Sequence, residues 1–110
     1  MAYLSATEEK ALREFSARIR DALGQNLLEL KLFGSKATGR FHDESDIDVL
    51  VIVAERNEQV LDAVSEILLD MELKYNSRLS PVVLTFAEFQ QNRKYQTLFY
   101  HEVVRSGAPL

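Results

Sequence analysis

The chain has 110 residues, enough for one folded domain and little more, so we expect a single domain over residues 1–110. Its 13 Lys and Arg residues against 17 Asp and Glu residues give a formal net charge of -4, which argues against binding duplex nucleic acid through a basic face. The chain has no cysteine, which excludes disulfides, thiol nucleophiles and cysteine-ligated metals. No apolar run is long enough to span a bilayer and no signal peptide opens the sequence, so a cytoplasmic protein without membrane contact is expected.

The first half of the chain predicts a helix followed by two strands. Ser5-Ala6-Thr7-Glu8 is a capping-box pattern, and the apolar residues that follow at helical spacing predict a helix over 6–23. Leucines alternate with charged residues over 27–33, which predicts a strand with one buried face. The run IDVLVIVA over 47–54 is apolar on both faces after Asp48, which is typical of a central strand covered on both sides.

The second half predicts a helix, a strand and a last helix. Asn57 caps a helix whose expected apolar stripe steps by three and four residues, through Leu61, Val64, Leu68, Met71 and Tyr75. Pro81 opens a short strand over 82–86, a helical turn is expected over 88–92, and a final helix is expected over 95–105. The order α-β-loop-β-α-β-α predicts an α/β (α+β) fold, a small mixed β-sheet with helices packed on it. The last two strands are expected to run parallel, joined by a right-handed crossover.

The loop between the first two strands carries the residues that indicate chemistry. Gly34-Ser35 follows the first strand, and Asp46 and Asp48 stand at the entrance to the central strand. Because side chains alternate along a strand, both carboxylates are expected on the face shared by Leu50 and Ile52. Two carboxylates this close favour a hard divalent cation between them, Mg²⁺ or Mn²⁺. The alternative is that the acidic residues only keep the loop in solvent.

Gly34 and Ser35 predict a turn that holds phosphate. Glycine lets a phosphate approach the backbone closely, and Ser35 adds a hydroxyl donor. Lys36 and Arg40 follow closely enough to serve as counter-charges for a polyphosphate. The alternative for Gly34 is an ordinary turn glycine. A P-loop is excluded, because Arg40-Phe41 stands where that motif requires Lys and then Ser or Thr.

These features together resemble a known family. Gly34-Ser35, Gly39-Arg40 and Ser45-Asp46-Ile47-Asp48 resemble the GSxxxG…SDxD signature of the DNA polymerase beta-like nucleotidyltransferase superfamily, and the small size resembles its minimal nucleotidyltransferase (MNT) branch. The resemblance implies the nucleotidyltransferase fold and transfer of a nucleotidyl group from ATP or another NTP to an acceptor hydroxyl, with Mg²⁺ as cofactor and pyrophosphate released. Asp46 and Asp48 would be the catalytic residues and metal ligands. The residues expected to bind the nucleotide are Gly34, Ser35, Lys36, Arg40 and Ser45.

The superfamily usually has a third carboxylate on a neighbouring strand, and the match places Val82, next in the sheet to Asp48, at that position. Glu88 beyond the strand and Asp43 and Glu44 in the loop are the acids that remain as substitutes. Two functions therefore stay open. One is an Mg²⁺-dependent nucleotidyltransferase, and the other is a nucleotide-binding antitoxin module that neutralises a helical HEPN-type RNase by binding it. A partner protein or a homodimer is expected under both.

The aromatic residues near the end of the chain are a separate candidate. Tyr95, Phe99 and Tyr100 form either an interface patch or part of the core against the sheet, and core packing is the default. His42 is expected to be a loop residue in solvent. His101 is expected at a surface or packing edge, and no second histidine stands at a spacing that suits zinc.

Overall fold

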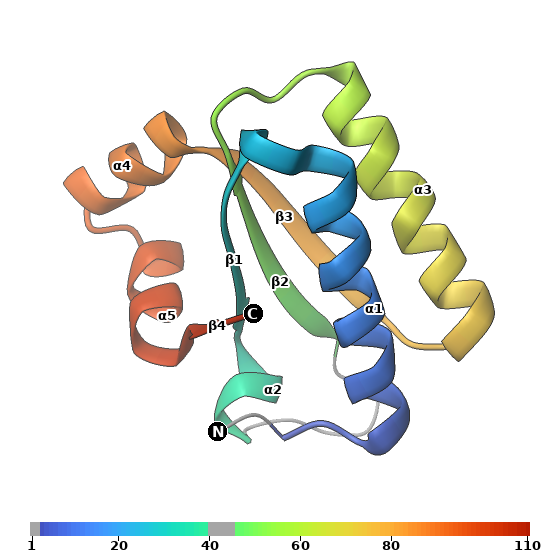
Figure 1. Ribbon diagram of the computed structural model, residues 1–110. Coiled ribbons are helices and arrows are strands. Elements are labelled where there is room, and N and C mark those ends of the chain that lie inside the picture. The colour runs from blue at the N-terminus through green and yellow to red at the C-terminus, as the bar shows by residue number, and fades with distance from the viewer. Residues whose placement is uncertain (1–2, 40–45) are drawn as a thin grey trace.

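The computed structural model describes residues 3–39 and 46–110 of the chain (Figure 1). The elements follow in the order α1 (Ala6–Leu23), the 3-10 turn η1 (Gly24–Asn26), β1 (Leu27–Phe33), α2 (Ser35–Thr38), β2 (Ile47–Val53), α3 (Glu58–Tyr75), β3 (Leu79–Thr85), α4 (Phe86–Lys94), α5 (Leu98–Ser106) and β4 (Ala108–Pro109). Within the described residues no helix combines the length and apolarity that crossing a membrane requires.

The strands form one mixed sheet in the order β3-β2-β1-β4. β1 runs antiparallel to β2 and to β4, while β2 and β3 run parallel. Figure 1 shows α1 and α3 over one face of this sheet, with α4 and α5 on its other side. The predicted α/β fold with a small mixed sheet is confirmed, and so is the parallel pairing of the last two predicted strands.

The helix starts follow from local hydrogen bonds that the sequence predicts. The Ser5 N–H donates to Oε1 of Glu8 at 2.9 Å, and the Glu8 N–H donates back to Oγ of Ser5 at 3.1 Å. Asn57 caps α3 in a similar way, because its Oδ1 accepts the Val60 N–H at 3.0 Å. Both caps satisfy backbone donors that a helix start leaves without an intrahelical partner.

The buried stripe of α3 differs from the predicted one. Val60, Val64, Ile67 and Met71 are buried, whereas Leu61 is 44% exposed. The predicted and the observed stripes share Val64 and Met71 and have the same helical spacing, so spacing alone does not choose between them. Contact with α1 and the sheet makes the choice, and Leu68 and Tyr75 pack only at the edge of the core.

The C-terminal third also departs from the sequence prediction. β3 begins at Leu79 and includes Pro81, which is tolerated because β3 is an edge strand of the described sheet. The expected turn and final helix are two nine-residue helices, α4 and α5, separated near Gln96, whose φ is 50°. β4, which pairs with β1, was not predicted from the sequence at all.

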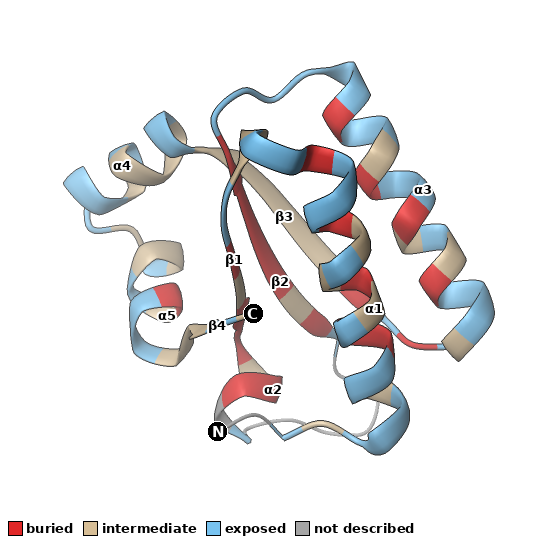
Figure 2. Cartoon of the chain, viewed as in Figure 1, coloured by how far each residue is buried: buried red, intermediate tan, exposed pale blue. Residues whose placement is uncertain are grey.

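The core divides into two parts, one on each face of the sheet (Figure 2). The face beneath α1 and α3 holds the larger cluster, which includes the fully buried Phe15, Ile19 and Met71. The opposite face holds a small cluster whose buried members are Phe33, Leu50, Ile52 and Val103. Within β2 every residue is buried except Asp48, which is half-buried near the start of the strand.

Candidate functional site

The Gly34 turn and Asp48 meet at one end of the sheet. β1 ends at Phe33, which lies opposite Asp48 in the antiparallel register. Gly34 has a φ of 80°, and a Cβ added to it would overlap Oδ2 of Asp48 and lie 3.2 Å from its Cγ. Both the backbone conformation and the lack of space therefore require glycine here. The structure places the two features of the predicted site in direct contact.

The residues after Gly34 form a single helical turn, which the sequence analysis did not include. In α2 the Ala37 N–H donates to the Gly34 carbonyl at 3.1 Å, and the Gly39 N–H donates to the Ser35 carbonyl at 2.8 Å. Gly39 ends the turn in the left-handed region with a φ of 84°, close to the Tyr3 ring. The turn therefore begins and ends in conformations that favour glycine.

The two predicted metal ligands lie at the start of β2. Asp46 is exposed and comes one residue before the strand, whereas Asp48 is half-buried within it. Asp48 shares its face of the sheet with Phe33, Leu50 and Ile52, the apolar cluster under α5. The carboxylates therefore stand at the edge of the small core, where solvent meets apolar side chains.

Electrostatics at Asp48 favour a bound cation. Burial is the largest effect that raises the pKa of Asp48 above its ordinary value, and the nearby carboxylates of Glu102 and Asp46 raise it further. A positive ion between these oxygens would relieve the repulsion, and oxygen ligands are those that hard divalent cations prefer. The donor set thus fits Mg²⁺ or Mn²⁺. Sequence reasoning missed Glu102, because it lies far along the chain on α5 and belongs to no motif.

Among the described residues, no third acid completes a metal site with Asp46 and Asp48. Within residues 3–39 and 46–110, no group of three His, Cys, Asp or Glu side chains is close enough to hold a metal ion. In the parallel register Asp48 pairs with Ser80, while Val82 pairs with Leu50. The expectation that Val82 lies next to Asp48 is therefore wrong. Ser80 lies there, and Val82 is the following residue of β3 on the same face of the sheet. Val82 is half-buried against the small apolar cluster.

Glu88 cannot supply the missing acid. Its carboxylate accepts the Thr85 N–H at 2.8 Å and both Arg56 guanidinium contacts at 2.7 Å, and these bonds lower its pKa, the Thr85 N–H contributing most. Thr85 also lies at the far end of β3 from Ser80, which is roughly 16 Å along the strand at about 3.3 Å per residue. Glu88 caps α4 and holds Arg56, away from the site. Asp43 and Glu44 lie outside the described residues.

Lys36 is placed in the interior rather than toward solvent. Its side chain is 3% exposed, and its Nζ lies 3.0 Å from Oε2 of Glu8. Burial alone raises the pKa of Glu8, but the Ser5 N–H and Lys36 outweigh it and hold that pKa below its ordinary value. A phosphate contact by Lys36 requires this pair to open, so that role stays a prediction. Arg40 and Ser45 lie outside the described residues.

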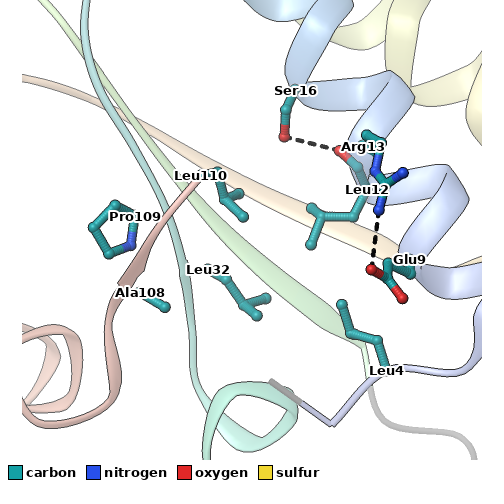
Figure 3. Close-up of a pocket in the computed structure, with 9 residues that line it drawn as sticks. All are labelled: Leu4, Glu9, Leu12, Arg13, Ser16, Leu32, Ala108, Pro109 and Leu110. Atoms are coloured by element: carbon teal, nitrogen blue, oxygen red, sulfur yellow. Dashed lines mark hydrogen bonds and ion pairs between the residues drawn. The ribbon is translucent and has the colours of Figure 1, made fainter. Parts of the chain in front are cut away.

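A separate hollow of about 460 Å³ lies between α1 and β4 (Figure 3). Leu12, Leu32 and Leu110 form part of its apolar lining, and Glu9 and Arg13 pair along its rim. Leu32 belongs to the large cluster under α1 and α3, so this hollow opens on the face of the sheet away from Asp48. Neither the turn nor the carboxylates line it, so it is not the candidate site.

A comparison with known protein families shows which family this chain resembles. The family described as nucleotidyltransferase domain matches residues 12–104. The chain belongs to this family. The predicted resemblance to the nucleotidyltransferase superfamily is thereby confirmed.

Two curated relatives from Methanocaldococcus jannaschii are similar over almost the whole chain. One is 31% identical over 103 residues, which cover 94% of this chain and 97% of the relative. The other is 34% identical over 101 residues, which cover 87% of this chain and 91% of the relative. Each carries the name "Putative protein adenylyltransferase". Both alignments therefore span nearly the whole of this chain and of the relative.

Two solved structures share the fold. A toxin–antitoxin structure with AMP-PNP superposes with a TM-score of 0.59 at 25% identity, covering 92% of this chain and 70% of that chain. A structure of a tri-AMPylated Shewanella oneidensis HEPN toxin in complex with an MNT antitoxin superposes with a TM-score of 0.57 at 22% identity, covering 92% and 69%. These likenesses confirm the nucleotidyltransferase fold.

Proposed function

We propose that this nucleotidyltransferase binds ATP with Mg²⁺ where Gly34 meets Asp48 and transfers AMP to a hydroxyl of a partner protein. One observation carries the proposal. The Gly34 backbone lies against the Asp48 carboxylate with no room for a Cβ, so a turn suited to phosphate and a carboxylate suited to a metal ion share one place. The names of the two relatives support AMP as the transferred group and a protein as its acceptor.

Asp46 and Asp48 would hold the metal ion. Their fit rests on the raised pKa of Asp48, which follows from its burial and from the negative charge of Glu102 and Asp46. When bound, the ion would neutralise negative charge on the phosphate oxygens and lower the pKa of the acceptor hydroxyl. The exposure of Asp46 gives its carboxylate access to solvent.

The residues of the turn would orient the triphosphate. Gly34 lets the backbone approach the Asp48 carboxylate closely, and the Ser35 hydroxyl would donate to a phosphate oxygen. The acceptor oxygen then bonds to the α-phosphorus as the bond from that phosphorus to the bridging oxygen breaks. The acceptor loses its proton to water, and pyrophosphate leaves with the electron pair, so AMP becomes esterified to the acceptor.

A second function is favoured by exposed apolar side chains on α4, on α5 and between them, which together are called the C-terminal apolar surface. Phe86, Tyr95, Leu98 and Val104 are 51%, 69%, 88% and 61% exposed. By contrast, Phe99 packs edge-on against Phe33, so the aromatic segment divides between surface and core. We propose that this surface binds a HEPN-type RNase, and one solved structure with this fold holds an MNT antitoxin in complex with a HEPN toxin. Neutralisation by binding alone would not need the third carboxylate of the superfamily, at whose position the sequence match placed Val82. A homodimer stays a prediction.

The test compares two radioactive forms of ATP in the presence of Mg²⁺ and a HEPN-domain RNase. AMP transfer is expected to label the RNase from ATP carrying ³²P at the α position, and not from ATP carrying it at the γ position. The Ser35→Ala variant should lose up to about tenfold in triphosphate affinity for each 1.4 kcal/mol that its hydroxyl contributes.

The same experiment separates the two functions. Inhibition of the RNase with no transfer of label would support neutralisation by binding and contradict AMP transfer. Label in the RNase from both forms of ATP would mean that a different group is transferred. The absence of both label and inhibition would contradict both functions.

A further inference from the structure

The last residue of α5 is hydrogen-bonded to the Gly34 turn. Oγ of Ser106 accepts the Gly34 N–H at 3.0 Å, and the same hydroxyl donates to the Glu102 carbonyl at 2.7 Å. A serine hydroxyl has one proton, and here that proton goes to the helix backbone. The oxygen therefore faces Gly34 as an acceptor, and the direction of both bonds is fixed by the helix end.

Contacts on both sides hold Ser106 in this place. Upstream in α5, Val103 is 1% exposed and packs with Phe33, the residue before the turn. Downstream in β4, Ala108 pairs with Leu32 in the antiparallel register with β1. The chain thus contacts β1 before and after Ser106, which keeps the backbone of this residue beside the strand end that leads into the turn.

The turn needs such a restraint because it begins with glycine. Gly34 has access to more backbone conformations than any other residue type, and its φ of 80° is one that other residues rarely adopt. The bond to Ser106 fixes the orientation of the peptide between Phe33 and Gly34. Rotation of that peptide would change both the shape of the turn and the space beside the Asp48 carboxylate.

We propose that Ser106 is a positioning residue for nucleotide binding, which acts by holding the Gly34 turn in its binding conformation. This inference rests on the proposed function, because it assumes that the turn receives the triphosphate. Ser106 itself does not touch the nucleotide. Its effect passes through one backbone N–H, so a hydroxyl at this position is required while the rest of the side chain is not.

The experiment uses two substitutions at Ser106 and one matched control. Ser106→Ala removes the hydroxyl, and Ser106→Thr keeps it. Ser16→Ala is the control, because Oγ of Ser16 makes the same kind of intrahelical bond, to the Leu12 carbonyl at 2.8 Å, on the other face of the sheet. Three quantities are measured for each protein: the affinity for AMP-PNP with Mg²⁺ by calorimetry, the exchange rate of the Gly34 amide by NMR, and the urea midpoint.

Ser106→Ala is expected to weaken AMP-PNP binding about tenfold, which corresponds to about 1.4 kcal/mol, and to speed exchange of the Gly34 amide. Ser106→Thr should restore both values, and Ser16→Ala should change neither. A lower urea midpoint for Ser106→Ala with unchanged affinity would show a purely structural role and overturn the inference.

Two further outcomes are distinguishable. Unchanged exchange of the Gly34 amide in Ser106→Ala would overturn the inference even if affinity fell, since the effect would then not pass through Gly34. Failure of the unaltered protein to bind AMP-PNP would overturn the proposed function by itself, and this inference with it.

Discussion

The two faces of the sheet are built differently, although they share the same strands. Beneath α1 and α3 lies the large cluster, in which Phe15, Ile19 and Met71 are 0% exposed. Beneath α4 and α5 only a small cluster is buried, and Val82 and Phe99 pack at its margin. One face therefore supplies most of the apolar burial that stabilises the fold, while the other leaves room for polar chemistry.

Helix length explains the difference. α1 and α3 have 18 residues each and lie along the sheet, so each buries a long apolar stripe. α4 and α5 have nine residues each, and the cluster beneath them is small. Asp46 is exposed and Asp48 is half-buried at the start of β2. Contact with solvent lowers the cost of placing charged groups at this end of an otherwise buried strand.

The largest expected effect is on stability, at the well-packed face. Phe15→Ala should lower the free energy of unfolding by about 3–5 kcal/mol, because it leaves a cavity in the large cluster. Phe99→Ala should cost only about 1–2 kcal/mol, because this ring is half-buried at the margin of the small cluster. Urea unfolding of both variants measures the contrast. Equal losses would mean that the two faces contribute alike.

The next effect is on binding, at the open face. Replacing Asp46 and Asp48 together by Asn should weaken Mg²⁺-dependent AMP-PNP binding at least about a hundredfold, or about 2.7 kcal/mol, with the fold retained. Calorimetry measures the binding, and far-UV circular dichroism checks the fold. Unchanged affinity in the folded double variant would exclude these carboxylates as the metal site.

The same double variant should also change how stability depends on pH when no metal ion is present. The pKa of Asp48 is raised in the folded state, mainly by burial, so the folded state holds this proton to higher pH than the unfolded state does. Wild-type stability should then fall as pH rises from the ordinary carboxyl range through the raised pKa, and the Asn variant should lack that fall. Urea unfolding across this range measures it. A constant difference between the two proteins would contradict the raised pKa.

A carboxylate added on β3 tests where a third acid belongs. Val82→Asp should raise the rate of label transfer roughly tenfold, a small part of what general-base help can provide, at a cost of about 1–3 kcal/mol in stability from the small cluster. Ser80→Asp is the matched variant, because Ser80 is the direct neighbour of Asp48. A rate increase in Ser80→Asp alone would assign the position to the register neighbour. No increase in either would show that transfer does not depend on an acid here.

The last expected effect concerns the stability that the ion pair between Glu8 and Lys36 of α2 provides. Glu8→Gln should cost about 1–2 kcal/mol near neutral pH, because it removes the charge that pairs with this buried ammonium. The folded-state pKa of Glu8 is lowered, so its contribution is present above the ordinary carboxyl pKa and is lost as pH falls through the lowered value. The difference between Glu8→Gln and wild type should therefore shrink in acid.

Glu9→Gln is the control for this prediction. Glu9 pairs with Arg13 on the exposed side of α1, a surface ion pair that is expected to contribute about 0–0.5 kcal/mol. Urea unfolding of both variants at neutral and acid pH gives the comparison. A loss in Glu8→Gln no larger than in Glu9→Gln would show that Lys36 does not depend on this pair.

The sequence by itself determined the features that depend on neighbours along the chain. The capping box at Ser5–Glu8, the strands at Leu27–Phe33 and Ile47–Val53, and the pairing of a Gly-Ser turn with an Asp-x-Asp entrance all follow from local hydrogen bonding and side-chain alternation. Motif and spacing were enough to indicate the family, because both halves of the site lie within one loop and the strand ends beside it.

Only the tertiary structure decided which distant residues meet at that loop. Val60 rather than Leu61 faces the core, because α1 and the sheet select between two stripes of equal spacing. Lys36 turns inward to Glu8, while Glu102 and Ser106 reach the site from α5. Such contacts join segments far apart in the chain, and no local pattern encodes them. They exist because strand register and helix packing bring the segments together.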